Sequence, residues 1–259
     1  MRGYNPIELS DITRRLVCRV TQKGEERKYY RFRGGRWYGG VATGDVVGCN
    51  LRCKFCWSWR FSHSTTGGWF ESIDSAFSKL VHIAEKNNYY YVRLSGGEPT
   101  LSREHLLGLM KLLSETKYTF ILETNGILLG YDESYAAEIS RFSNIAVRVS
   151  FKGTTPDEFH LLTGANPSFF SIQLRSLENL ITSGLQPCKD FYPAVMLSFS
   201  KPESYVEFKE RLKALSPRLA SCIDEEYVIL YPHVVEVLRK YNLKPTISYS
   251  PGSVPDFMI

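Results

Sequence analysis

Short apolar runs alternate with longer amphipathic stretches along most of the chain. The short runs predict buried strands and the longer stretches predict helices. The predicted strands span residues 41–47, 90–94, 118–123, 145–151 and 192–199. The predicted helices span residues 72–86, 103–116, 168–183, 202–215 and 224–241. Strands and helices in alternation predict an α/β fold with a parallel sheet and right-handed crossovers.

Residues 1–40 have a different pattern. A charged stretch over residues 22–28 precedes arginines interleaved with aromatic residues over residues 29–38. Such a run can stack on a nucleic-acid strand and neutralise it. The alternation is more typical of strands, so we predict an amphipathic hairpin that turns at Gly34 and Gly35 and covers the core. This interpretation divides the chain into an N-terminal extension, residues 1–40, and a core domain, residues 41–259.

Size and composition agree with one globular α/β unit. The chain has 259 residues, of which 43% are hydrophobic and 23% are charged, as is usual for a globular enzyme. No apolar run approaches the length of a membrane span, and the N-terminus lacks the apolar core of a secretory signal. We therefore expect a cytoplasmic protein without a membrane partner. The net charge of +5 is compatible with RNA, an acidic protein or a phosphorylated substrate, and also with an ordinary solvated surface.

Three cysteines, Cys49, Cys53 and Cys56, form a CxxxCxxC pattern. Three thiolates on one short loop can hold three irons of a cubane cluster and leave the fourth iron without a protein ligand. The alternatives are a structural zinc site, for which His63 is the nearest further ligand, and three unrelated buried thiols. The other cysteines, Cys18, Cys188 and Cys222, lie far from the loop and follow no regular framework. That spacing favours reduced thiols over disulfides.

A second motif, Ser95-Gly96-Gly97-Glu98-Pro99, follows the predicted strand at residues 90–94. Ligands of parallel α/β folds bind at the carboxyl ends of the strands. Glycine allows the backbone to approach a ligand closely, and Glu98 offers a carboxylate suited to a cationic amine. An ordinary turn between a strand and a helix is the alternative.

The two motifs together resemble the radical S-adenosylmethionine (SAM) superfamily, from about Thr43 onward. The resemblance implies a partial (β/α)6 barrel, open on one side, in which the three cysteines hold a [4Fe-4S] cluster. It also implies that Gly96, Gly97, Glu98 and Pro99 place SAM. Phe55 matches the aromatic residue that the family prefers between the second and third cysteines. In this family the reduced cluster cleaves SAM to a 5′-deoxyadenosyl radical that abstracts hydrogen from a substrate.

Two later segments resemble the activating enzymes of glycyl-radical enzymes. Residues 123–126, Glu-Thr-Asn-Gly, are similar to a segment in which the acid helps to bind a monovalent cation beside SAM, which makes Glu123 and Asn125 candidates for cofactor binding. Residues 150–166 are similar to the activase pattern of DxK, histidine, TG and asparagine. Lys152 matches the lysine of that pattern, whereas Ser150 stands where aspartate is expected, and we interpret His160 as structural.

Other side chains are candidates by position. Trp57, Trp59 and Arg60, next to the cysteine loop, can contact a planar or anionic substrate, or can pack the loop onto the barrel. Met196, on the predicted strand at residues 192–199, can touch the adenine of SAM or fill the core. Lys152 can contact the cofactor or the substrate, or can extend from the barrel rim.

We therefore expect a radical SAM enzyme that receives electrons from a reductant such as flavodoxin or ferredoxin. The favoured reaction is hydrogen abstraction from a backbone glycine of a glycyl-radical partner. The alternatives are radical modification of RNA or a nucleoside, and a non-catalytic iron–sulfur or zinc-binding adaptor. The sequence assigns no catalytic residue beyond the cofactor site and does not identify the substrate.

Overall fold

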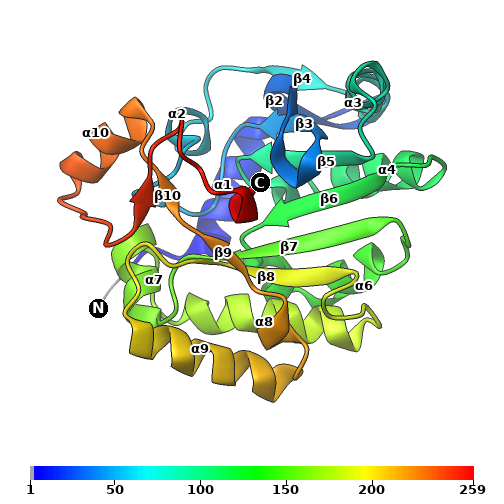
Figure 1. The fold of residues 1–259 in the computed structure, drawn as a ribbon. Coiled ribbons are helices and arrows are strands. Elements are labelled where there is room, and N and C mark those ends of the chain that lie inside the picture. Colours follow the sequence, from blue (N-terminus) through cyan, green and yellow to red (C-terminus); the bar gives the residue numbers. More distant parts are fainter. Residues whose placement is uncertain (1–2) are drawn as a thin grey trace.

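A curved, mainly parallel sheet organises residues 3–259, which are described by a computed structural model (Figure 1). Its strands are β1 (Cys18–Thr21), β2 (Gly24–Gly35), β3 (Val41–Val46), β4 (Trp69–Glu71), β5 (Tyr91–Gly96), β6 (Thr119–Thr124), β7 (Ile145–Phe151), β8 (Phe191–Met196) and β9 (Asp224–Glu226). The order is β1-β2-β3-β5-β6-β7-β8-β9, with β4 beside β2. Strands β3 to β9 along this path pair in parallel, whereas β1, β2 and β4 pair antiparallel. The sheet does not close, which confirms the predicted partial barrel.

Helices connect the strands, and most of them cover the outside of the sheet, whereas α2 follows the cysteine loop at the cavity. They are α1 (Pro6–Val17), α2 (Trp59–Ser62), α3 (Ile73–Asn87), α4 (Arg103–Ser114), α5 (Ile127–Tyr131), α6 (Glu133–Ile139), α7 (Pro156–Thr163), α8 (Phe169–Thr182), α9 (Pro202–Leu215) and α10 (Pro232–Lys240). The 3-10 turns within residues 3–259 are η1 (Trp37–Gly39), η2 (Pro99–Leu101), η3 (Leu219–Ser221) and η4 (Asp256–Met258). A small parallel pair, β10 (Val228–Ile229) and β11 (Ser248–Tyr249), lies outside the main sheet.

The core lies between the sheet and its outer helices. Phe151 on β7 packs against Phe170 of α8 and Phe208 of α9, with ring centroids 6.3 and 5.1 Å apart, and all three side chains are buried. Burying a side chain of this size stabilises the fold by roughly 1.5–3 kcal/mol. This packing fixes the outer face of β7, so alternate residues of the strand point into the barrel.

The local sequence explains where several helices begin. Ser72 accepts a hydrogen bond from the backbone of Ser75 at the start of α3, and Thr155 caps α7 ahead of Pro156. Side-chain oxygens at these positions satisfy backbone N–H groups that have no partner inside the helix. The predicted helices at residues 72–86, 103–116, 168–183 and 202–215 are confirmed to within two residues at each end.

The N-terminal segment contains a hairpin, but its predicted turn is wrong. Strand β1 turns into β2 at residues 22–23, and Gly34 and Gly35 lie at the end of β2, where they pair with β3. Helix α1 was not predicted, although Asn5 caps it and Pro6 occupies its first turn. The boundary expected after residue 40 falls between β2 and β3, which are neighbours in one sheet.

The predicted helix at residues 224–241 is also wrong in its first half. Residues 224–226 form β9 beside β8, and the helix begins at Pro232. The acidic residues of this segment are compatible with a helix locally, but Asp224 and Glu226 form ion pairs with Arg148 of β7. Contacts with a distant strand therefore override the local propensity.

The expectation that all cysteines are reduced thiols is wrong for one pair. Cys188 and Cys222 form a disulfide that connects the chain ahead of β8 to the chain ahead of β9, with Cα atoms 5.5 Å apart. These residues are separated by 34 positions in sequence, so only the fold brings them together. Cys18, Cys49, Cys53 and Cys56 are free. Within residues 3–259, no helix is both long and apolar enough to cross a membrane.

Candidate active site

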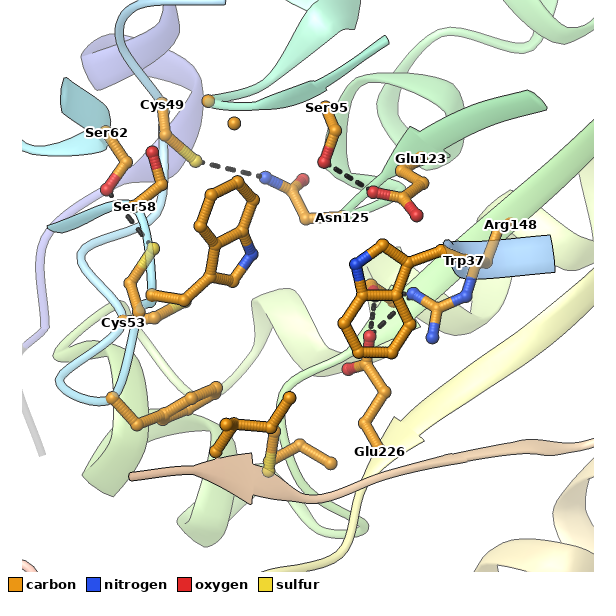
Figure 2. A pocket seen from close by; sticks show the side chains of 18 of the residues that line it. Trp37, Cys49, Cys53, Ser58, Ser62, Ser95, Glu123, Asn125, Arg148 and Glu226 are labelled. Carbon is orange, nitrogen blue, oxygen red and sulfur yellow. Dashed lines mark hydrogen bonds and ion pairs between the residues drawn. The ribbon is translucent and has the colours of Figure 1, made fainter. Parts of the chain in front are cut away.

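A cavity of about 1230 Å³ lies inside the barrel, at the carboxyl ends of the parallel strands. Its wall includes the cysteine loop, the turn after β5, the end of β6 and inward-facing residues of β7, β8 and β9. Figure 2 shows Cys49 and Cys53 on one side, Trp37, Arg148 and Glu226 on the other, and Asn125 between them. Residues that are far apart in sequence therefore face one space.

The cysteine loop is held by hydrogen bonds to its backbone and to Asn50. Arg52 donates to the carbonyl oxygens of Cys49 and Ser62, and Asn50 donates to Ser10 of α1 at 2.9 Å. Asn125, at the end of β6, donates to the Asn50 side-chain oxygen at 2.7 Å and approaches the Cys49 sulfur at 3.7 Å. The loop is therefore fixed to α1 and to the end of β6.

The three thiols lie in largely buried surroundings that favour the protonated form when no metal is bound. Burial raises the pKa of Cys49 to about 12 and also raises the pKa values of Cys53 and Cys56. A bound metal favours the deprotonated thiol. Among residues 3–259, no three His, Cys, Asp or Glu side chains converge closely enough to hold one metal ion. A cluster of several irons takes each thiolate at a different iron, so its ligands need not meet at one point. His63, the further ligand considered for zinc, is linked to Cys56 through the Ser62 hydroxyl.

The glycines after β5 allow two backbones to lie in contact. Gly97 donates to the carbonyl oxygen of Val46, and Glu98 donates to that of Gly48, both at 2.8 Å. A Cβ atom on Gly97 would lie 2.1 Å from the Gly48 oxygen, and Gly96 has a φ of +89°. Any larger side chain at Gly97 would push this turn away from the start of the cysteine loop.

The Glu98 side chain is occupied inside the protein. It is 2% exposed and accepts hydrogen bonds from the Thr100 backbone and hydroxyl, the Thr124 hydroxyl and the Asn125 backbone. Burial raises the pKa of this carboxyl group, and these hydrogen bonds oppose the rise. Because its carboxylate joins the turn after β5 to the end of β6, contact between Glu98 and an amine of the cofactor stays a prediction.

Inward-facing charges form ion pairs along the barrel wall. Arg93 donates to Glu123 at 2.9 Å, and Arg148 donates to Glu226 at 2.6 Å. Lys152 lies 3.7 Å from the second oxygen of Glu226. Sequence reasoning missed Arg93, Arg148 and Glu226. The signal for the two arginines was their position on buried strands, two residues before Ser95 and Ser150, since residues at this spacing share one face of a strand.

Glu226 lies next to Ser150, the position at which this chain departs from the activase pattern. Ser150, which stands where aspartate is expected, donates to Glu226 at 2.8 Å. Glu226 comes from β9, a segment predicted as helix. The neighbouring strand therefore supplies a carboxylate beside Ser150 and Lys152.

Most of the remaining predicted site residues line the same cavity, and Pro99 lies just outside it. The ring centroids of Phe55 and Phe199 lie 5.7 Å apart, and the Trp59 ring stacks on His63 with centroids 3.6 Å apart. Met196 and Arg60 line the cavity. Pro99 begins the η2 turn beneath Glu98. His160 bonds to the Ala165 carbonyl oxygen at 2.7 Å, in agreement with a structural role.

Glu123 is expected to make folding stability depend on pH. Burial opposes its ionisation, but Arg93, Arg148, Ser95 and Tyr38 outweigh burial and lower its pKa from 4.5 to about 2. A lowered folded-state pKa stabilises the fold above pH 4.5, and this stabilisation is lost as pH falls from about 4.5 to about 2. The pKa difference corresponds to about 3 kcal/mol.

Urea unfolding of the native protein and of Glu123→Gln at pH values from 6 to 3 tests this expectation. The difference in unfolding free energy between the two proteins should shrink as the pH falls below about 4.5, because the unfolded chain then binds a proton at Glu123 that the folded protein does not yet bind. Exposed Glu115 provides the matched control, since Glu115→Gln should show a small difference at every pH. A Glu123→Gln difference that stays constant across the range would contradict the assignment.

Three comparisons with known proteins agree with this geometry. A family model described as the Radical SAM superfamily matches residues 45–208. A probable GTP 3',8-cyclase of Methanosarcina mazei is 28% identical over 158 residues, covering 60% of this chain and 45% of that protein. A putative glycyl-radical enzyme activating enzyme of Methanocaldococcus jannaschii is 29% identical over 134 residues, covering 44% of this chain and 50% of that protein. This chain thus spans about half the length of these curated relatives.

Solved structures share the fold at low sequence identity. SuiB of Streptococcus suis, bound to S-adenosylmethionine, superposes with a TM-score of 0.57 at 16% identity, covering 76% of this chain and 45% of SuiB. TYW1 with a lysine-pyruvate adduct bound superposes with a TM-score of 0.53 at 16% identity, covering 92% of this chain and 89% of that one. At these identities the likeness shows the fold alone.

Proposed function

The chain belongs to the radical SAM superfamily, and we propose that it is an enzyme that binds a [4Fe-4S] cluster through Cys49, Cys53 and Cys56 and binds SAM beside it. When bound and reduced, this pair of cofactors supplies a 5′-deoxyadenosyl radical that abstracts hydrogen from a substrate. The single observation that carries the proposal is the convergence of the cysteine loop, the Gly96-Gly97 turn and Asn125 at one end of the cavity.

The protein's own residues position the two cofactor sites side by side. The contact of Gly97 with Gly48 places the turn after β5 directly beside the cysteine loop, and Asn125 holds the Cys49 side of that loop. Strands and loops line the space between them, which opens to solvent on one side. A reactive radical requires exclusion of water, so we expect bound substrate to cover this opening. The superfamily uses an external electron donor, and we expect flavodoxin or ferredoxin in that role.

Anaerobic reconstitution with iron and sulfide, followed by dithionite and SAM, tests the proposal. We expect 5′-deoxyadenosine to form, and to form only when the protein, SAM and the reductant are all present. Chromatography with mass detection measures the product. A fully reconstituted cluster that yields no 5′-deoxyadenosine would favour a non-catalytic adaptor instead.

One candidate substrate is a backbone glycine of a partner enzyme. The pattern that ends at Asn166 and the relative named as a glycyl-radical enzyme activating enzyme support it. Lys152 and Glu226 face the cavity where such a peptide would enter. Incubation of the reduced enzyme and SAM with candidate glycyl-radical proteins should give a doublet in electron paramagnetic resonance. A spectrum without an organic radical for every candidate would count against this substrate.

A second candidate is a nucleotide. Several relatives are named as GTP 3',8-cyclases, and the cavity wall carries arginines from β2, β5 and β7. A nucleotide would bring its own negative charge to a cavity of this kind. Formation of a new nucleotide product together with 5′-deoxyadenosine, detected by mass spectrometry, would support this substrate class.

A further inference from the structure

Arg31 and Arg33 form a pair of neighbouring cations on the cavity wall. They occupy alternate positions of β2, so both point to the same face of the strand, and both line the cavity. Each donates its Nε hydrogen to the same oxygen of Asp45, at 2.8 and 2.9 Å. One buried carboxylate thus orients two guanidinium groups.

The charges of this group do not cancel. Asp45 is fully buried, with a side-chain exposure of 0%, and it supplies one negative charge to two guanidiniums. Among residues 3–259, the terminal Nη nitrogens of both arginines have no hydrogen-bond partner. Arg148, by comparison, pairs with the two carboxylates of Asp224 and Glu226. The Arg31–Arg33 pair therefore keeps a net positive charge and free N–H donors.

An aromatic ring completes the group. The guanidinium carbons of Arg31 and Arg33 lie 6.0 and 5.8 Å from the ring centroid of Trp57, a residue that is 39% exposed. Tyr30 fastens this part of β2 to the cysteine loop, through a hydrogen bond of 2.9 Å to Ser58 and a ring stacked 3.9 Å from Phe61. The cations and the indole ring are thus held next to the proposed cluster site.

The cavity is large enough for a second ligand. Sites for one small molecule usually enclose about 300–1,000 Å³, whereas this cavity encloses about 1230 Å³. The proposed SAM site uses its cysteine side. Arg31, Arg33 and Trp57 line the same cavity next to that site, so the remaining volume can hold a substrate against them.

We propose that Arg31, Arg33 and Trp57 bind a nucleotide substrate, with its phosphate on the two guanidiniums and its base beside the indole ring. Planar guanidiniums match phosphate oxygens with paired, charge-assisted hydrogen bonds. The several free N–H donors of two such groups suit the three-oxygen face of a phosphate. An indole ring gains energy from stacking on a base. This inference deepens the proposed function and rests on it.

Calorimetric titration of the reconstituted, unreduced protein, saturated with SAM, tests the site. The probes are the four ribonucleoside triphosphates, the matching nucleosides and inorganic triphosphate. Arg31→Gln and Arg33→Gln should each weaken binding of the best nucleotide about tenfold, and should leave nucleoside binding unchanged. Trp57→Leu should weaken binding of the nucleotide and of the nucleoside by the same factor, and should leave binding of inorganic triphosphate unchanged. Arg15→Gln, which removes one charge from an exposed position outside the cavity, should stay within about twofold of the native protein.

Two results would overturn the inference. One is a native protein that binds none of the four nucleotides at millimolar concentration, and the other is arginine variants that bind as Arg15→Gln does. Since these measurements need no reduction, formation of 5′-deoxyadenosine in the same preparations shows whether the proposed function survives. If a Gln variant unfolds, the Arg→Lys variant decides, because lysine can keep the ion pair with Asp45 but lacks the paired N–H donors.

Discussion

Replacement of Cys53 by alanine is expected to remove the cluster and to reduce 5′-deoxyadenosine formation by at least about 100-fold. Cys53 is 7% exposed and free, and it stands in the middle of the CxxxCxxC loop. A cluster with two protein ligands would expose a second iron, so we expect the variant to lose iron during desalting. Iron and sulfide assays, visible absorption and product formation measure the effect.

The matched control is Cys18→Ala. Cys18 is also free and buried, but it packs with Val17, Val47 and Leu101 outside the cysteine loop. This variant should keep its iron and its product formation, with a modest loss of folding stability. If Cys53→Ala kept native iron content, or if both variants lost iron equally, the assignment of the cluster ligands would be wrong.

Replacement of Glu98 by alanine is expected to destabilise the protein without metal by about 3–5 kcal/mol. The buried carboxylate accepts hydrogen bonds from Thr100, Thr124 and Asn125. Its removal leaves two backbone N–H groups and two hydroxyls without this partner, in a region closed to water. Urea unfolding under anaerobic conditions, followed by circular dichroism, measures the loss.

Glu104→Ala is the control for this prediction, because Glu104 lies exposed in the first turn of α4 and should change the unfolding free energy by less than about 0.5 kcal/mol. Glu98→Gln should lie between the native protein and Glu98→Ala, since the amide retains one acceptor oxygen. A Glu98→Ala variant that unfolds like the native protein but binds SAM more weakly would show that Glu98 contacts the cofactor rather than supports the fold.

These two predictions separate cofactor chemistry from the scaffold that positions it. The cysteines act on a ligand, and Cys53→Ala should lower the unfolding free energy of the metal-free chain only modestly, as Cys18→Ala does, because each removes one buried thiol. Glu98 joins the turn after β5 to the end of β6. Its loss should therefore lower both the unfolding free energy and the affinity for the cofactor. Measuring iron content and unfolding free energy on the same preparation of each variant therefore distinguishes a cluster ligand from a residue that stabilises the fold.

Most strands and helices of the barrel could be predicted because each depends on a local pattern. The apolar run at residues 145–151 is a strand in any fold that buries it, and Pro202 begins α9 as its position predicts. Helix α1 was missed despite its local cap at Asn5 and Pro6, whereas the other errors fall where distant contacts decide. The segment at residues 224–226 is a strand because β8 and Arg148 lie beside it, and the strand register of Gly34 and Gly35 depends on β3.

The sequence by itself determined the fold class and the chemical type of the site. Both motifs are local: the spacing of Cys49, Cys53 and Cys56, and the turn at Gly96 and Gly97. A few neighbouring residues are therefore enough to identify each of them. Only the tertiary structure decided which charges meet: Glu98 with the end of β6, Glu226 with Ser150, and Asp45 with two arginines. These contacts join residues of different strands. Their formation depends on strand order and register, which no local spacing encodes.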